Sequence, residues 1–359
     1  MNAPQGAHMG AEDDVEDPGR SGGSRRAFGA GGVSRGPAPR ARGGAHGFPI
    51  SEAPRPSQPI AADCDRACLE HVSDAVAHAM VSKDVASLPL SRDVKYTEGG
   101  QPLKVGDGFW ATASAVGTYV HYFADPAVGE VVAMRTMREG SGPNADNLMG
   151  LRVRVELGRI TDIETTFYKK GSGPSWNDAG IDGLNAMRGP PGAGHRLSRQ
   201  ELIQDANYYF EGLQRNDGHG YYPFTSTCNR LENGVATTNN TEVQKGQPFQ
   251  PFAFSCKEQF STGYYGVVTE IVNRRFLVAD PERGVVVAFA TFKHAGTVPV
   301  VHMTNGQDYN MSFFSKSSSI QIVEAFKITP DGLIDLVEAV GASAAYGLDS
   351  HWPGGLSGK

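Results

Sequence analysis

An internal duplication is the feature that most constrains this 359-residue chain. Two segments align as helix, loop and strand: "ACLEHVSDAVAHAMVSKDVASLPLSRDVKYTEGG" and "QELIQDANYYFEGLQRNDGHGYYPFTSTCNRLENG". Three identical residues recur 134 positions later: Pro89 as Pro223, Glu98 as Glu232, and Gly100 as Gly234. The offset then grows to 155 between Asp125 and Asp280, and to 174 between Gly158 and Gly332. Anchors that recur in one order predict two copies of a folding unit, the second enlarged by an insertion of 21 residues (155 minus 134).

Each copy presents the same kinds of element in the same order. The opening helix has an apolar stripe at helical spacing, formed in the first copy by Leu69, Val72, Val76 and Met80. A strand, a short helical piece and long hairpins follow, with Asp-Pro-x-x-Gly sequences that are typical of turns. A helix followed by a curved antiparallel sheet predicts the fold class α+β.

These patterns divide the chain into five parts. Residues 1–61 form a tail, 62–168 the first repeat, 169–195 a Gly/Pro-rich linker, 196–346 the second repeat and 347–359 a C-terminal tail. The first 60 residues contain no Leu, so they bury too little apolar surface to offset chain entropy and are predicted to be disordered. Their "SRRAFG" echoes a twin-arginine export signal, but no apolar stretch follows it. A cytoplasmic location is therefore expected, with export as the alternative.

Charge and hydropathy exclude two classes of partner. The formal net charge is -6, and no cluster of Lys and Arg offers the footprint of a nucleic-acid-binding surface. No run of about 18 apolar residues is present, so no membrane span is expected. The expected partner is a small molecule.

The four cysteines leave two interpretations open. Cys64 and Cys68 lie four positions apart at the start of the first helix, where two helical residues rarely have disulfide geometry, so no bond between them is expected. Cys228 and Cys256 could join a strand to a following helix. For a cytosolic protein, buried free thiols are favoured for all four.

The order of elements, with an acid ending the strand in both "DVKYTEGG" and "CNRLENGV", resembles the nuclear-transport-factor-like superfamily. This group includes SnoaL-like cyclases, ketosteroid isomerase, scytalone dehydratase and limonene epoxide hydrolase. The resemblance covers both repeats and implies two tandem cone-shaped α+β barrels, each a curved antiparallel sheet around a long helix with an apolar pocket. Many members dimerise through the sheet face, so the two repeats are expected to form a pseudo-dimer within the chain. A homodimer of whole chains stays open.

The resemblance places Glu98 where ketosteroid isomerase has its general base. A carboxylate at the mouth of an apolar cone is partly desolvated, which raises its pKa toward the range of a general base. Tyr96 shares a strand face with Glu98 and is expected to orient or protonate the substrate. His121, on the next hairpin, is the third catalytic candidate. Tyr119 shares its face, and Trp110 is expected in the core or pocket wall.

The second repeat differs beside its acid, where Arg230 stands two residues from Glu232. The pair is expected to keep Glu232 ionised, either as a salt bridge or as a clamp for a bound anion. Tyr209, on the second opening helix, is expected in the core or pocket wall. Arg230, Glu232 and Tyr209 join Trp110 and Tyr119 as candidate substrate-binding residues, and the first repeat is expected to abstract the proton.

Two functions follow as expectations. The first is an enzyme without cofactor or metal that acts on a small, largely apolar or carbonyl-bearing molecule, as a dehydratase, isomerase or lyase. The alternative is a non-catalytic module of the same fold that binds a small molecule or mediates assembly. The sequence has no phosphate-binding loop, no G-x-S-x-G motif and no His-x-x-x-His pair to suggest another chemistry.

Overall fold

The computed structural model describes residues 64–172, 187, 189–247, 249–311, 314–348 and 350–354. The tail predicted over residues 1–61 lies outside the described residues. The first repeat consists of α1 (Arg66–Ser82), η1 (Val85–Ser87), β1 (Leu90–Glu98), β2 (Gln101–Leu103), α2 (Phe109–Thr112), β3 (Ala113–Asp125), β4 (Glu130–Glu139), β5 (Asp146–Glu156) and β6 (Arg159–Lys169). The second consists of α4 (Arg199–Leu213), β7 (Phe224–Glu232), β8 (Val235–Ala236), η3 (Pro251–Ala253), α5 (Cys256–Ser261), η4 (Tyr264–Val267), β9 (Glu270–Asp280), β10 (Val285–His294), β11 (Val300–His302), β12 (Asp308–Asn310), β13 (Ser318–Ile328) and β14 (Ile334–Ala344).

The α+β class is confirmed, and each repeat has one six-stranded sheet. The strand orders are β2-β1-β6-β5-β4-β3 and β8-β7-β14-β13-β10-β9, so the two repeats share one topology. The antiparallel prediction was wrong at one pairing in each sheet, because β1 runs parallel to β6 and β7 runs parallel to β14. The chain crosses to the far edge after β2, and successive hairpins then bring β6 back beside β1. Local alternation of residues does not reveal the direction of such a crossover.

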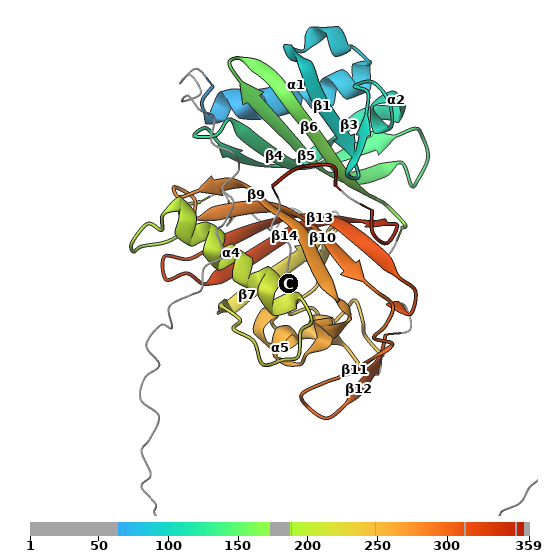
Figure 1. Cartoon of the computed structure of the whole chain (residues 1–359), viewed down its shortest axis with the longest axis vertical. Helices are drawn as coiled ribbons and strands as arrows, with labels where there is room; N and C mark the ends of the chain where they lie inside the picture. Colours follow the sequence, from blue (N-terminus) through green and yellow to red (C-terminus); the bar gives the residue numbers. More distant parts are fainter. Residues whose placement is uncertain are drawn as a thin grey trace, which may run out of the picture. The chain divides into compact units, whose positions relative to one another are not determined.

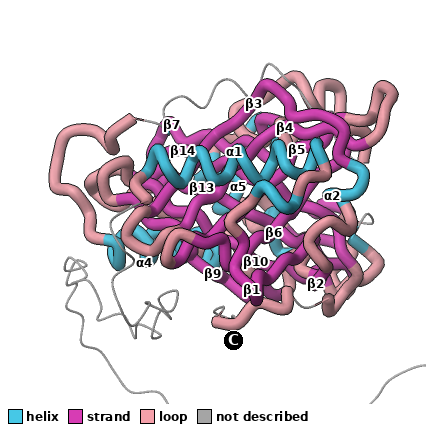
Figure 2. The backbone as a smooth tube through the Cα atoms, turned by 90° about the horizontal axis from the view of Figure 1, so that it is seen from above, coloured by secondary structure: helices cyan, strands magenta, loops and turns pink. Residues whose placement is uncertain are grey.

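A long helix covers the inner face of each sheet (Figure 1; Figure 2). The predicted stripe of α1 is confirmed, since Leu69, Val76 and Met80 are fully buried against β-strand side chains. Asp65 caps the helix by accepting a hydrogen bond from the backbone N–H of Cys68 at 2.9 Å. Ser198 starts α4 with a capping box. Apolar burial and capping together fix both helices on their sheets.

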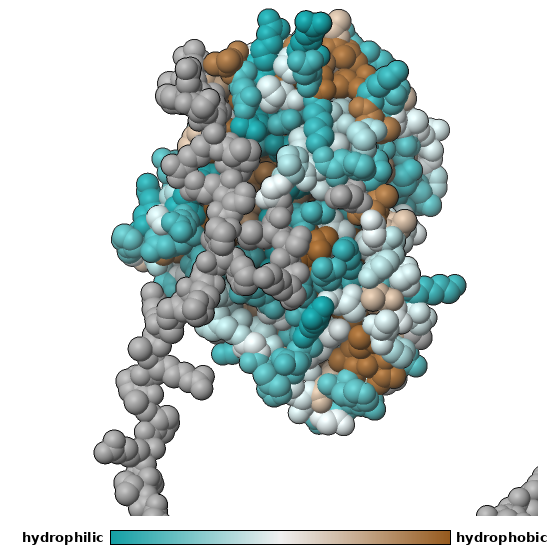
Figure 3. Space-filling model, viewed as in Figure 1, coloured by the Kyte–Doolittle hydropathy of each residue, from teal (hydrophilic) through white to brown (hydrophobic). Residues whose placement is uncertain are grey.

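The outer faces of the two sheets pack against each other. Their shared apolar core includes Phe123, Met134 and Leu148 from the first repeat and Leu277 and Phe289 from the second. On the face drawn in Figure 3, hydrophobic residues form small separate patches among hydrophilic ones. The apolar side chains on the outer face of each sheet are thus buried between the two repeats.

Reciprocal contacts tie the start of each helix to the other repeat. Arg66 opens α1, donates to Ala124 O at 3.0 Å and pairs with Asp280 of the second repeat at 2.9 Å. Arg199 opens α4, donates to Ala279 O at 3.0 Å and pairs with Asp125 of the first repeat. Each Asp-Pro turn therefore serves the other repeat as well as its own hairpin.

The prediction of free thiols was wrong for both cysteine pairs. Cys64 and Cys68 form a disulfide with Cα atoms 5.0 Å apart. Their spacing permits it because Cys64 precedes the N-cap residue Asp65 and lies outside the helix. Cys228 on β7 and Cys256 at the start of α5 form the second disulfide, with Cα atoms 5.8 Å apart.

Among the described residues, no helix is both long and apolar enough to cross a membrane.

Candidate functional site

The space between α1 and the inner face of the first sheet, called the first cone below, brings together three of the predicted site residues; the second cone is the corresponding space between α4 and the second sheet. Tyr96 donates a hydrogen bond to Glu98 Oε2 at 3.0 Å, as expected for residues two apart on one strand face. The ring of Trp110 packs edge-on against Tyr96, with centroids 5.9 Å apart. Both aromatic side chains are buried, while Glu98 keeps partial contact with solvent.

Glu98 also receives the backbone N–H of Phe109 at 2.6 Å, at the first turn of α2. Burial raises the pKa of Glu98, and the hydrogen bonds from Phe109 and Tyr96 oppose that rise. Gly108 makes this approach possible, since a Cβ atom there would lie 2.6 Å from Glu98 Oε2. The acid at the strand end therefore holds the start of α2 as well as facing the cone.

His121 and Tyr119 are not part of this cone, which corrects their predicted place in the site. Both lie on the outer face of β3, and both bond Glu338 on β14 of the second repeat, His121 through Nδ1 at 2.7 Å. His121 and Glu338 are almost fully buried between the sheets. Side chains alternate along a strand, so residues facing the other sheet cannot also face the helix.

The second cone brings together its three predicted residues and adds others. Arg230, with 2% of its side chain exposed, pairs with Glu232 as predicted. Its other terminal nitrogen donates to Gln259 Oε1 at 2.7 Å and to the hydroxyl of Tyr265. The Gln259 amide nitrogen is held by the backbone carbonyl of Pro251 at 2.7 Å, which turns its oxygen toward Arg230. The guanidinium stacks within 5.5 Å of the Tyr209 ring.

Glu324 on β13 is the functional candidate that sequence reasoning missed. It is 1% exposed, and burial raises its pKa to about 8, with the charge of Glu232 adding to the rise and Arg230 opposing it. Tyr209 lies close enough to lower that pKa. Burial raises the pKa of Tyr209 itself well above 10, so its phenol is neutral at pH 7. An acid between Ile322 and Phe326 on the buried face of one strand was the signal available in the sequence.

In this cone Arg230 Nε is buried without a hydrogen-bond partner in the described chain, and Tyr209 OH and Glu324 Oε2 are buried near each other with no hydrogen bond to a further group. Buried polar groups are nearly always satisfied, and exceptions concentrate where a ligand or a reaction needs them. The arrangement offers a fixed cation, a neutral phenol and a carboxyl that titrates near neutrality. Together they can bind an oxygen-bearing group and move a proton.

In the second repeat, an aromatic cap lies next to this cluster. Phe249 comes from the predicted insertion and Tyr309 from β12, with ring centroids 4.5 Å apart. Both pack on Tyr264, whose ring lies 5.1 Å from that of Tyr265. Figure 1 shows β11, β12 and α5 at the same end of the second sheet. The insertions of the second repeat therefore converge on the polar cluster of its cone.

Among the described residues, no group of three or more His, Cys, Asp or Glu side chains is arranged to hold a metal ion.

Comparison with known proteins singles out the same repeat. A family described as a domain of unknown function (DUF8021) matches residues 195–341. This span covers the second repeat, from the start of α4 through most of β14. No curated protein matches the chain.

Proposed function

We propose that this chain is a cofactor-independent enzyme of the SnoaL-like type. It acts by proton transfer on a small, largely apolar or carbonyl-bearing molecule, as a dehydratase, isomerase or lyase. A helix on the inner face of a six-stranded sheet, repeated with one topology, supports the SnoaL-like assignment. Packing of the two outer sheet faces supports an intrachain pseudo-dimer.

The observation that carries the proposal is the convergence of Arg230, Tyr209 and Glu324 inside the second cone, each with a buried polar atom that no group outside these three satisfies in the described chain. In the proposed reaction, ionised Glu324 removes a proton from the carbon next to a carbonyl group. The electron pair moves onto the carbonyl oxygen, where Arg230 and the Tyr209 phenol stabilise the negative charge. Protonated Glu324 returns the proton to another carbon in an isomerisation, or to a departing hydroxyl in a dehydration.

This assignment exchanges the expected roles of the repeats. Glu98 has a raised pKa and a phenol partner, but its second oxygen contact is the backbone of α2. The first cone therefore carries the second candidate base, with Tyr96 as its hydrogen-bond donor. A direct comparison of the two acids decides between the cones.

Hydrogen–deuterium exchange tests the proton-transfer step without knowledge of the full reaction. A panel of small ketones and 2-oxo acids is incubated with the protein in D₂O, and exchange next to the carbonyl is followed by NMR. The unchanged chain is expected to accelerate exchange of at least one compound. Glu324→Gln should lower that rate by about 10²–10⁴-fold, the range of a general base. Glu98→Gln and the control Glu139→Gln should leave it nearly unchanged.

The opposite pattern, with exchange lost in Glu98→Gln alone, would move the reaction to the first cone. Catalysis would be contradicted if every compound exchanged at its uncatalysed rate while calorimetry showed that the same compounds bind. That result would favour the alternative function, a binding or assembly module. The large aromatic side chains that fill both interiors, among them Trp110, Phe210 and Phe260, are the observation that favours the alternative.

The two disulfides also change the proposal for cellular location. Disulfides persist in oxidising compartments and are rare in the cytosol, so we propose an exported protein rather than a cytoplasmic one. Thiol labelling of denatured, unreduced protein tests this. No reactive thiol is expected in material from the native host, whereas four labelled cysteines would contradict export.

A further inference from the structure

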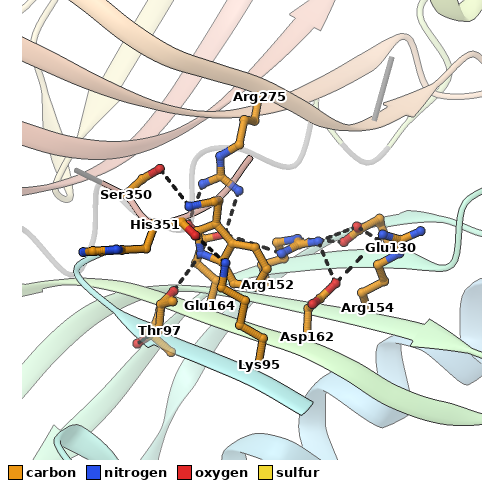
Figure 4. A network of polar contacts seen from close by, with 12 residues as sticks. Lys95, Thr97, Glu130, Arg152, Arg154, Asp162, Glu164, Arg275, Ser350 and His351 are labelled. Carbon is orange, nitrogen blue, oxygen red and sulfur yellow. Dashed lines mark hydrogen bonds and ion pairs between the residues drawn. The ribbon is translucent and has the colours of Figure 1, made fainter. Parts of the chain in front are cut away.

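A second polar site lies between the two sheets, on the opposite face of the first sheet from its cone. It surrounds a cavity of about 260 Å³. The lining comes from the outer face of the first sheet, from β9 of the second repeat and from the C-terminal segment: Lys95, Glu130, Arg152, Arg154, Asp162, Arg275, Phe276, Leu277, Trp352, Pro353 and Gly354. Figure 4 shows its charged residues converging between the sheets.

The lining carries an excess of positive charge. Four cationic side chains face two carboxylates, Glu130 and Asp162, and Glu164 stands behind them. Glu164 forms a bidentate ion pair with Arg275, with N–O distances of 2.6 and 3.0 Å. Glu130 is taken by Arg152 in the same way, at 2.7 and 2.9 Å. Arg154 is paired with Glu156 at 2.5 Å, so each of the three arginines has a carboxylate partner of its own and Lys95 is the remaining cation of the lining.

Lys95 is the cation of the lining that has no carboxylate in direct contact, and the charges of Asp162 and Glu164 act on it only from a longer distance. In the described chain it makes no ion pair, and its ammonium donates to the backbone carbonyl of His351. Burial lowers its pKa, so an anion that kept Lys95 protonated would be bound favourably. The alternation of β1 places Lys95 in this cavity and its neighbour Tyr96 in the cone.

Nearby N–H groups are also free to donate. Arg152 Nη1, Arg154 Nε and Arg275 Nε are buried without hydrogen bonds in the described residues. Arg152 Nη1 lies 3.6 Å from Glu164, which is too long for a hydrogen bond. The guanidinium groups of Arg152 and Arg275 are almost fully buried, at 3% and 6% exposed, so these donors cannot turn to bulk water.

The cavity has an apolar side as well. The Trp352 ring lies 3.8 Å from Lys95 Nζ and 4.8 Å from the Arg152 guanidinium carbon. Its indole N–H donates to Thr97 Oγ1 at 2.8 Å, which fixes the ring at the edge of the cavity. Leu277 and Pro353 complete this side. An apolar cavity of roughly 150 Å³ accommodates benzene, so the space suffices for a small ring that bears a carboxylate.

We propose that this cavity binds a small organic carboxylate. The carboxylate group is held by Lys95 and the free N–H of Arg152, and the apolar body lies against Trp352 and Leu277. Charge-assisted hydrogen bonds to two cations provide the specificity for an anion. The site is separate from the proposed proton-transfer site, and neither depends on the other.

Benzoate is the probe, and its binding is measured by calorimetry and by the fluorescence of Trp352. Saturable binding of one benzoate per chain is expected, with a fluorescence change that is absent from Trp352→Phe. Lys95→Met should weaken binding by about tenfold or more, the loss of one charge-assisted contact. Lys104→Met, at an exposed lysine, is the matched control and should bind unchanged. If Lys95→Met does not fold, as judged by circular dichroism, Lys95→Gln takes its place and should weaken binding in the same way.

Absence of saturable binding, or equal affinity in Lys95→Met, would overturn the proposal. Equal weakening in Lys104→Met would trace binding to general surface charge and overturn it too. Inorganic phosphate is titrated in parallel. Binding of phosphate without benzoate would overturn the assignment to a carboxylate with an apolar body.

Discussion

The two cones share one topology and differ at three matched positions in their interiors. Strand register aligns Tyr96 with Arg230 through their partners Ile163 and Val337. Register also aligns Leu151 with Glu324. Leu151 pairs with Ala133 and Thr165, and Glu324 pairs with Ala288 and Ala339, which are the equivalents of Ala133 and Thr165 in the second repeat. The helix positions counted from Arg66 and Arg199 align Val76 with Tyr209. The first cone kept an interior that is largely apolar, whereas the second placed a cation, a phenol and a carboxyl in the same space.

This difference shows that one topology accommodates both a largely apolar interior and a polar one. Burying charge costs free energy unless it is paired, so the second cone trades stability for a polar interior. Other contacts stabilise both repeats: the two disulfides, the interface between the sheets, and the ion pairs of Arg66 and Arg199 with the turns of the other repeat.

The largest expected effect concerns pH. The pKa of Glu324 is about 8 in the folded chain against an ordinary 4.5, so the folded state binds the proton more tightly. The free energy of unfolding should therefore fall as pH rises from about 4.5 to about 8, by at most about 5 kcal/mol. Glu324→Gln should lose this fall, as measured by urea unfolding at pH 5.5 and 8.5. Leu151, its apolar counterpart, offers Leu151→Met as a control that keeps the full pH slope. An unchanged slope in Glu324→Gln would assign the effect elsewhere.

Removing the cation of the second cone comes next. Arg230→Met leaves Glu232 beside a buried carboxyl and should destabilise the fold by about 3–5 kcal/mol, as breaking a buried pair does. The matched change in the first cone, Tyr96→Phe, removes one hydrogen bond and should cost about 1 kcal/mol. Urea unfolding at pH 7 measures both. Equal losses would mean that the two interiors are energetically alike.

The disulfides give a third comparison. Replacing Cys228 and Cys256 with Ala removes a cross-link that closes a loop of 28 residues. The chain-entropy relation predicts that this lowers the free energy of unfolding by about 3–4 kcal/mol. Replacing Cys64 and Cys68 with Ala removes a cross-link that closes a loop of 4 residues and should lower the free energy of unfolding by about 2 kcal/mol. Thermal unfolding of the two double variants gives the order. A larger loss from the Cys64–Cys68 pair would contradict it.

The smallest expected effect probes the contact between the sheets. By register Gly150 is the counterpart of Val323, and the two meet, since a Cβ atom on Gly150 would lie 2.3 Å from Val323 Cγ1. Gly150→Val should therefore destabilise by about 1–3 kcal/mol through overpacking. Adding Val323→Ala should recover much of the loss in chemical unfolding. No recovery would show that the strain of Gly150→Val is local to its own sheet.

The interface also explains why His121 was misplaced by sequence reasoning. Glu164 and Glu338 are equivalent residues 174 positions apart, and each bonds a cationic or titratable side chain of the other repeat. Arg275 pairs with Glu164, and His121 hydrogen-bonds Glu338. From the sequence alone, a histidine on a strand near the candidate acid Glu98 is a catalytic candidate, because the sequence does not tell which sheet face meets the helix and which meets the other sheet.

The sequence by itself determined the duplication, the α+β class, the apolar stripe of α1, and the pairs Tyr96–Glu98 and Arg230–Glu232. These follow from local periodicity, from the two-residue repeat of a strand and from anchors in one order. Only the tertiary structure decided the parallel pairing of β1 with β6, the closure of both disulfides, the burial of Glu324 and the position of Trp352 beside Lys95. Each of these depends on which distant segments come together, and residue spacing along one chain does not encode the direction from which a neighbour arrives.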